Sequence, residues 1–232
     1  MKRHALPLPG GELNHWQAGE GPAVLLVHGW EGSPADMAPF VEPLIAAGHH
    51  VVLAELPGHG HSSFEWTSVP HSAEAIFHLG TALGPLKGLI AHSVGGAVVT
   101  RAMEIGLTAE RAVLIASPAR YRDYARAFAA MLGLDREGST QMLQQLAQRW
   151  GVDVARLSTP ASAARLSQPA LVIHSADDPV VPIADAESII AAWAGAELMR
   201  CQGLGHRRIL GDPAAVEAAV AFVTTPALVA VA

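Results

Sequence analysis

Short apolar runs that alternate with helical stretches constrain the fold of this chain more than any other feature. The runs include V-L-L-V at residues 24–27 and A-V-L-I-A at residues 112–116, in which no polar residue interrupts. A strand that is apolar throughout is buried on both faces, as in a parallel sheet covered by helices. We therefore predict an α/β fold with a mostly parallel central sheet flanked by helices, its strands at residues 12–16, 23–27, 50–54, 89–91, 111–116, 170–174 and 197–201.

Helical periodicity fills most of the intervals between these strands. Ser72 is expected to cap the second helix at its N-terminus, and Gly84 is expected to end it. Pro39 and Pro43 fit poorly inside the first helix, so its geometry is expected to be irregular. The predicted helices cover residues 36–47, 72–83, 94–105, 185–194 and 213–223.

Length and composition exclude several classes of protein. The 232 residues suit a single α/β domain over residues 1–232. A net charge of −6 and the lack of a Lys/Arg run argue against a nucleic-acid partner. No apolar stretch reaches the ~20 residues of a membrane-spanning helix. Cys201 is the only cysteine, so we expect no internal disulfide and a cytoplasmic location. The sequence leaves the oligomeric state open.

The segment between residues 118 and 167 breaks the alternation, because it contains no convincing strand. We predict a small helical cap inserted at about residues 119–166, with Ser139 as a helix cap. Packing on the core is the favoured interpretation of its apolar stripes, and a roof over an apolar pocket is the alternative. The stripes recur at helical spacing, as Tyr121, Tyr124, Phe128 and Met131, then Met142, Leu143, Leu146 and Trp150.

This cap is also rich in arginine. Residues 119–166 contain seven arginines and four acidic residues, an excess of three positive charges. Arg120, Arg122 and Arg126 are candidates to bind an anionic substrate. A solvated helix face is the interpretation that we favour for them.

The motif A-H-S-V-G-G at residues 91–96 indicates a nucleophile elbow. It joins a largely apolar run to a helical stretch, which is the strand–turn–helix context in which a serine hydroxyl is presented at the end of a sheet. Residues two before and two after the serine must be small, and Ala91 and Gly95 meet that requirement. We predict that Ser93 is the nucleophile.

Two further groups follow Ser93 in the order that a serine hydrolase of this kind needs. An acid, either Asp177 or Asp178, comes after one strand, and His206 comes after the next. Carboxyl ends of parallel strands share one edge of a sheet, so these groups are expected to meet there. The backbone amides of Trp30 and Val94 are expected to form an oxyanion hole.

The chain resembles compact bacterial serine hydrolases of the α/β-hydrolase superfamily. The resemblance is carried by H-G-W-E-G-S, P-G-H-G-H-S, A-H-S-V-G-G, H-S-A-D-D-P-V-V-P and G-L-G-H, which span residues 28–206. It implies an α/β-hydrolase fold with a catalytic triad, and it selects Asp178 as the acid beside Ser93 and His206. Two positions depart from the family pattern, Ala91 and Ser175, and neither removes a reacting group.

We therefore predict hydrolysis of a carboxylic ester of small to medium size through an acyl-enzyme on Ser93. No cofactor and no metal are expected, because His59 and His61 lack further ligands at motif spacing. His28, His59, His61 and His92 are interpreted as structural groups around the site. A thioesterase, an amidase or a carbon–carbon hydrolase with the same triad is the alternative, and a non-enzymatic ligand receptor is a third possibility.

Overall fold

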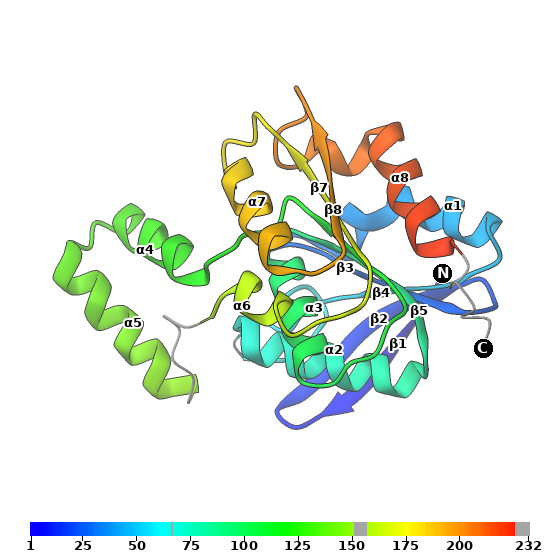
Figure 1. Cartoon of the computed structure of the whole chain (residues 1–232). Coiled ribbons are helices and arrows are strands. Elements are labelled where there is room, and N and C mark those ends of the chain that lie inside the picture. Colours follow the sequence, from blue (N-terminus) through cyan, green and yellow to red (C-terminus); the bar gives the residue numbers. More distant parts are fainter. Residues whose placement is uncertain (66, 151–156, 226–232) are drawn as a thin grey trace.

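The computed structural model describes residues 1–65, 67–150 and 157–225, and it contains one eight-stranded sheet (Figure 1). The strand order is β1-β2-β4-β3-β5-β6-β7-β8. β1 pairs antiparallel with β2, and β2 pairs antiparallel with β4. The remaining neighbours, from β4 through β3, β5, β6 and β7 to β8, are parallel. The strands are β1 (Lys2–Leu8), β2 (Gly11–Ala18), β3 (Ala23–Val27), β4 (His50–Ala54), β5 (Leu86–His92), β6 (Ala112–Ile115), β7 (Ala170–Ser175) and β8 (Ala196–Cys201).

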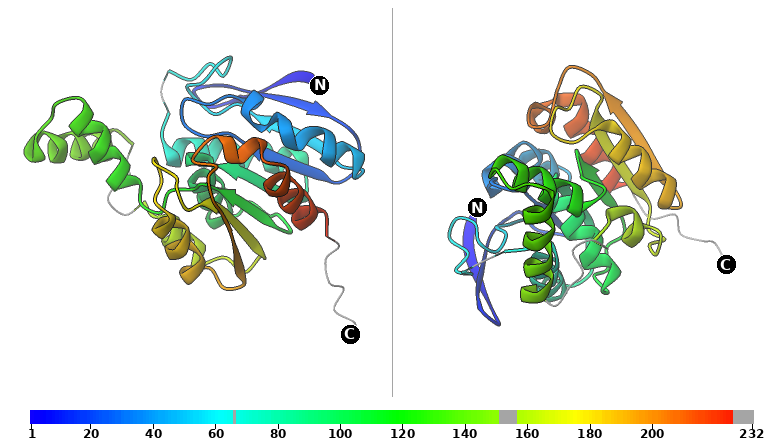
Figure 2. Two further views of the ribbon diagram at one scale, coloured as in Figure 1. Left: turned by 90° about the horizontal axis from the view of Figure 1, so that it is seen from above. Right: turned by 90° about the vertical axis from the view of Figure 1, so that its left-hand side faces the viewer.

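Helices cover both faces of this sheet (Figure 2). α2, α3, α6 and α7 contribute to the apolar core on one face, and α1 and α8 contribute to the core on the other. The helices are η1 (Pro34–Phe40), α1 (Val41–Ala46), α2 (Val69–Leu83), α3 (Val94–Glu104), α4 (Tyr121–Met131), α5 (Arg136–Trp150), α6 (Thr159–Ala163), α7 (Ile183–Ala192), η3 (Arg208–Gly211) and α8 (Pro213–Thr224).

The central strands supply apolar side chains to both cores. Along β3, Leu25 and Val27 point into the core beneath α2 and α3, while Val24 and Leu26 point into the core beneath α1 and α8. Successive side chains of a strand leave on opposite faces, so a strand without polar residues satisfies both layers. The predicted fold class, a mostly parallel sheet flanked by helices, is confirmed.

One strand was missed. β1 pairs with β2 through a two-residue turn at Pro9–Gly10, where Gly10 adopts a φ of +90°. Most of β1 is exposed, so it lacks the apolar pattern by which the other strands were found. Its position at the edge of the sheet also tolerates Pro7. The Pro-Gly pair was the available signal, because it favours a tight turn between two strands.

Two predicted helix caps are wrong. Ser68, and not Ser72, caps α2, because its Oγ accepts the amide of His71 at 3.2 Å. Ser139 lies inside α5, and the carboxylate of Asp135 accepts the amide of Gly138 instead. The expected irregularity near Pro39 is present: residues Pro34–Phe40 form a 3₁₀ helix before α1 begins.

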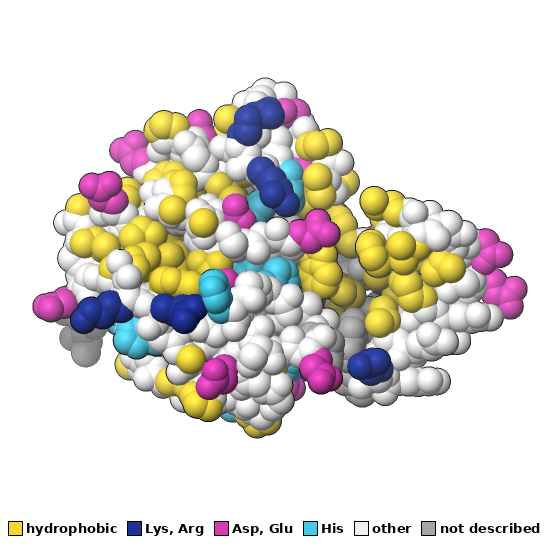
Figure 3. Space-filling view, turned by 180° about the vertical axis from the view of Figure 1, so that it is seen from behind, with side chains coloured by type: hydrophobic (Ala, Val, Ile, Leu, Met, Phe, Trp, Pro, Cys, Tyr) yellow, Lys and Arg dark blue, Asp and Glu magenta, His cyan; other side chains and the backbone are white. Residues whose placement is uncertain are grey.

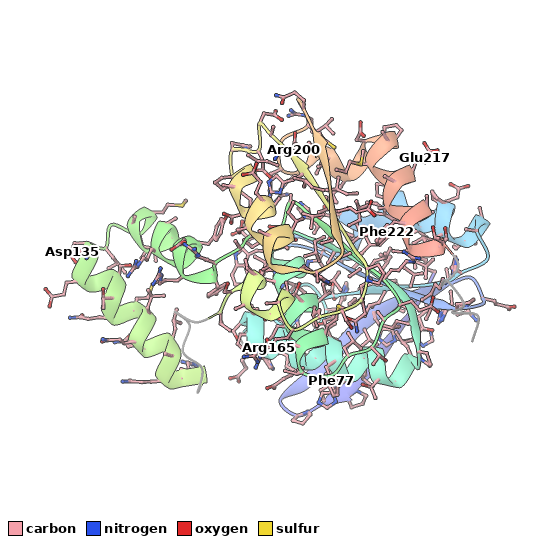
Figure 4. The ribbon with its side chains drawn as sticks, viewed as in Figure 1. Phe77, Asp135, Arg165, Arg200, Glu217 and Phe222 are labelled. Carbon is pink, nitrogen blue, oxygen red and sulfur yellow. The ribbon has the colours of Figure 1, made fainter. Side chains whose placement is uncertain are left out.

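Helices α4 and α5 form a hairpin that projects from the body of the protein (Figures 1 and 2). Figure 4 shows Asp135 at its outer end. At the base of the hairpin, Arg120 and Ser158 form an antiparallel bridge. Tyr124 near the base of α4 donates its hydroxyl to Asp185 of α7 at 2.7 Å. The hairpin is therefore attached at its base.

The favoured interpretation, that the apolar stripes pack on the core, holds at Tyr121, which contacts the core, but not for the outer part of the hairpin. Phe128 is 55% exposed and Met131 is 84% exposed, whereas Leu143 is buried. The side chain of Trp150 lies outside the described residues. A projecting hairpin has too few neighbours to cover both of its faces, so part of the stripe remains in contact with water. In the described part of the chain, no helix combines the length and the apolar character needed to cross a bilayer.

Candidate active site

Ser93 lies in a strained turn between β5 and α3. Its φ of +51° and ψ of −126° fall in a region that non-glycine residues rarely adopt. The helix that follows crosses close to β3: a Cβ on Gly95 would lie 2.5 Å from the carbonyl oxygen of His28, and a Cβ on Gly96 would collide with Ser117. Small residues are therefore required at these positions for the turn to form.

Loop residues from the ends of β7 and β8 reach Ser93. Nε2 of His206 lies 3.1 Å from Oγ of Ser93, and Nδ1 of His206 lies 2.8 Å from Oδ2 of Asp178. Asp178 and Ser93 are buried, and His206 is partly buried. An ionised Asp178 accepts a hydrogen bond from Nδ1–H of His206. The ring proton therefore stays on Nδ1, and Nε2 is unprotonated and faces the serine hydroxyl. The three residues thus form one chain of hydrogen bonds.

The carboxylate of Asp178 is held in its ionised form. Burial by itself raises the pKa of this group, but the hydrogen bond from His206 and those from two backbone amides outweigh it and lower the pKa below its ordinary value. The amides of Val180 and Val181 donate to Oδ1 at 2.8 and 2.9 Å. Asp178 therefore keeps its negative charge at neutral pH beside the imidazole.

The neighbouring acid, Asp177, has a different set of partners. Asp177 is exposed, but its Oδ1 accepts the hydroxyl of Ser175 and the amide of Gly203, the latter at 2.8 Å. The hydrogen bond from Ser175 is the first cause that lowers the pKa of Asp177. This carboxylate joins the loop after β7 to the loop that carries His206.

The two predicted oxyanion amides belong to residues close to Ser93. Val94 is the first residue of α3, and the first amides of a helix have no acceptor within it. Trp30 follows Gly29, where an added Cβ would lie only 3.0 Å from Cβ of Ser93. Among the described residues, no acceptor is found for the amide of Trp30. Both amides are thus available to a ligand near the serine.

Three histidines, of which His28 and His92 are buried, hold the loops around this site. Leu56 donates its amide to Nε2 of His28 at 3.1 Å, so Nδ1 of that ring carries the proton and donates to the carbonyl of Gly29 at 2.7 Å. Nε2 of His92 donates to the carbonyl of His206 at 2.9 Å. His59 accepts the amide of Glu31 at 3.3 Å. These contacts agree with the structural interpretation of His28, His59 and His92.

Two of these rings should make stability dependent on pH. Burial lowers the pKa of His28 and of His92 from 6.5 to about 4. The unfolded chain then binds more protons than the folded chain between these values, so the free energy of unfolding should fall as the pH drops from 6.5 toward 4. At ~1.4 kcal/mol per pKa unit, each ring contributes up to about 3 kcal/mol.

Urea unfolding at pH 7 and pH 4.5 measures this effect. His92→Gln retains a donor for the carbonyl of His206 but cannot be protonated, so its loss of stability in acid should be smaller than that of the wild type. His28→Gln serves as the second variant. An equal loss in the wild type and in both variants would contradict the assignment.

A pocket of about 230 Å³ opens beside Ser93 and His206. Sequence reasoning missed two of the charged side chains in its wall, Asp36 and Arg207, although Arg207 directly follows the predicted catalytic residue His206 in the chain. Arg120, Arg122 and Arg126 are not in this wall. Within the described residues, no three His, Cys, Asp or Glu side chains gather as a metal site. The pocket is lined by Gly29, Trp30, Gly32, Ala35, Asp36, Pro39, His92, Ser93, His206, Arg207, Leu210 and Gly211.

A parallel sheet with a strained serine and a histidine–carboxylate pair at its carboxyl edge defines the hydrolase class of α/β proteins. Comparison with known sequences agrees, since residues 24–219 match the alpha/beta hydrolase family. The chain belongs to this family. The resemblance seen in the sequence motifs is thereby confirmed.

Two relatives are named pimeloyl-[acyl-carrier protein] methyl ester esterase. The protein from Xanthomonas campestris pv. campestris (strain B100) is 28% identical over 235 residues, which cover 83% of this chain and 91% of that protein. The protein from Xylella fastidiosa (strain 9a5c) is 28% identical over 248 residues, which cover 87% and 94%. This chain is therefore similar to esterases along most of its length.

Solved structures show the same fold. An esterase from Exiguobacterium antarcticum superimposes with a TM-score of 0.75 at 17% identity, covering 94% of this chain and 97% of the other. A hydrolase from Pseudomonas aeruginosa PA01 superimposes with a TM-score of 0.76 at 20% identity, covering 97% and 98%. At these identities, the likeness concerns the fold.

Proposed function

We propose that this protein is a serine esterase that cleaves a carboxylic ester of small to medium size through an acyl-enzyme on Ser93. The observation that carries the proposal is the continuous hydrogen-bonded chain from Asp178 through His206 to Ser93. A serine hydroxyl is a weak nucleophile near neutral pH and requires a base that is itself oriented by an acid. These three side chains meet that requirement.

The mechanism has two halves. In the first, Oγ of Ser93 attacks the ester carbonyl carbon while Nε2 of His206 takes its proton and then returns it to the leaving alkoxide. The amides of Trp30 and Val94 stabilise the negative oxygen, and one such donor is typically worth about 3 kcal/mol of barrier. In the second half, His206 takes a proton from water, whose oxygen attacks the acyl carbon. His206 then returns this proton to Oγ of Ser93 as the bond between Oγ and the acyl carbon breaks, which releases a carboxylic acid and regenerates the serine hydroxyl.

The relatives favour an ester over the other acyl compounds that the same triad can cleave. Their names specify the methyl ester of an acyl chain, and we extend that substrate class to this chain. Thioesters, amides and carbon–carbon bonds remain as alternative substrates of the same machinery. A ligand receptor is disfavoured, because a receptor has no need of a strained serine paired with an oriented histidine.

We further propose that the α4–α5 hairpin is a cap that binds the acyl chain. Figure 3 shows apolar side chains on the hairpin lobe and on the facing edge of the body, on either side of a groove. The exposed members on the hairpin are Phe128, Met131, Leu132 and Leu134. A contiguous patch of exposed apolar side chains is typical of a surface that binds an apolar ligand or partner.

A series of methyl esters from acetate to decanoate tests both parts of the proposal. The wild type should hydrolyse the series, and Phe128→Ser should reduce kcat/KM for the longer esters about tenfold while leaving acetate nearly unchanged. A buried phenyl ring contributes about 1.5–3 kcal/mol, which sets the size of this effect.

Ile45→Ser, at a partly exposed position on α1, is the matched control. Equal losses for acetate and decanoate in a folded Phe128→Ser variant would argue against the cap. A wild type that hydrolyses no member of the series, while it cleaves thioesters or amides of the same acyl groups, would replace the ester by one of the alternatives.

A further inference from the structure

One wall of the catalytic pocket carries a positive charge that the proposed mechanism does not use. Arg207 directly follows His206 in the chain and lines the same pocket as Ser93. Its backbone carbonyl accepts the amide of Leu210, which fixes the start of η3. The charge of Arg207 also contributes to lowering the pKa of the buried His92, after burial as the main cause. Arg207 itself is exposed to solvent on this wall.

Most other basic side chains near the sheet form an ion pair or a hydrogen bond. Arg101 and Arg165 bind Glu104 at 2.6 and 2.7 Å, and Arg208 donates to the carbonyl of Gly203 at 2.9 Å. In contrast, no hydrogen-bond or ion-pair acceptor for the guanidinium of Arg207 is found in the described parts of the chain. A guanidinium has five donors in a planar fork, which match the oxygens of a carboxylate or a phosphate.

The acidic group of the same pocket has a different role. Oδ2 of Asp36 accepts the amide of Ser33 at 2.9 Å, which caps the N-terminus of η1. That contact places Asp36 on the wall formed by η1, whereas Arg207 belongs to the wall formed by the loop before η3. An anionic group would be attracted to the second wall and repelled from the first. The pocket therefore has a preferred orientation for a charged substrate.

We propose that Arg207 binds an anionic group, a carboxylate or a phosphate, on the ester substrate, and that it selects charged esters over neutral ones. This inference rests on the proposed esterase function. The pocket of about 230 Å³ is small, so the anion and the scissile ester are separated by only a few bonds. Arg207 is a specificity-determining residue, and it takes no part in proton transfer.

Paired substrates measure this selection. Monomethyl succinate carries a carboxylate where methyl succinamate carries a neutral amide, and acetyl glycerol phosphate carries a phosphate that acetyl glycerol lacks. For one of the two pairs, kcat/KM of the wild type should be about tenfold higher for the anion, since charged hydrogen bonds contribute about 1.5–3 kcal/mol. The pair that shows the difference identifies the anion.

Arg207→Gln should remove the preference while leaving turnover of the neutral esters close to the wild-type rate, with the change mainly in KM. Arg207→Lys should retain part of the preference for the anion, because the positive charge remains but the planar, two-pronged guanidinium is lost. Arg200→Gln removes an equal charge outside the wall of the pocket, at the end of β8 (Figure 4), where Arg200 pairs with Glu187, and should preserve the preference.

Two results would overturn the inference. The first is an equal ratio of anionic to neutral kcat/KM in the wild type and in Arg207→Gln. The second is a loss of neutral-ester turnover in Arg207→Gln, which would assign Arg207 to the support of the His206 loop. A wild type that hydrolyses neither member of either pair, and whose Ser93 is not labelled by a fluorophosphonate, would reject the esterase function itself and the inference with it.

Discussion

Replacing Ser93 with alanine is expected to abolish ester hydrolysis while the fold stays intact. Removal of a catalytic serine costs about 10⁶ in turnover, because the members of a triad act as a unit. The hydroxyl of Ser93 contacts only His206 in the described part of the chain, and alanine at this position bears the same backbone strain as serine. The free energy of unfolding of Ser93→Ala should therefore be close to that of the wild type.

Turnover of an activated ester and labelling by a fluorophosphonate measure the effect. The wild type should be labelled at Ser93, and Ser93→Ala should be neither labelled nor active. Ser188→Ala is the matched control, since the hydroxyl of Ser188 donates only to a carbonyl of its own helix α7, at 2.8 Å. Substantial turnover by Ser93→Ala with an unchanged pH dependence would assign the nucleophile to another residue.

Asp178→Asn should reduce turnover by about 10⁴, the loss observed when a triad acid is converted to its amide. The asparagine amide group would donate to Nδ1 of His206 and force the proton onto Nε2, where it blocks transfer from Ser93. The charge that stabilises the imidazolium in the transition state would also be lost. The amides of Val180 and Val181 still find the remaining carbonyl oxygen, so the fold should persist.

Asp177→Asn is the comparison that separates the two adjacent acids. The side-chain oxygen of the introduced asparagine can still accept a hydrogen bond from the amide of Gly203. Turnover should therefore fall by less than about tenfold. Both variants are checked for folding by circular dichroism before their rates are compared. If Asp177→Asn were the crippled enzyme and Asp178→Asn nearly normal, the assignment of the acid would be wrong, although the serine hydrolase proposal would survive.

Much of the architecture follows from local sequence. Apolar runs such as residues 23–27 are buried on both faces in any fold that they join, so they identify parallel strands without a structure. The elbow at Ser93 is local in the same sense, because a strand, a tight turn and a helix start lie within a few residues. β1 was not predicted, because an exposed edge strand carries no apolar pattern.

Helix boundaries were less predictable. Ser68 and Ser72 are both suitable caps by residue type, and only the position of the chain before α2 selects Ser68. The same holds for Asp135 and Ser139 at α5. A cap is chosen by which oxygen reaches a free amide, and that depends on the path of the preceding loop.

Sequence alone determined which residues are chemically able to form the site, since Ser93, then Asp177 or Asp178, and then His206 follow β5, β7 and β8 in the required order. Tertiary structure decided how they meet. His206 reaches Ser93 across 113 residues of chain, and Asp177 and Asp178 differ in role only because one carboxylate faces the imidazole and the other braces two loops. The sequence also did not predict the projection of the hairpin, or that the guanidinium of Arg207 has no partner among the described residues. Local propensities act within a few residues, whereas these contacts depend on the closure of long loops around a completed sheet.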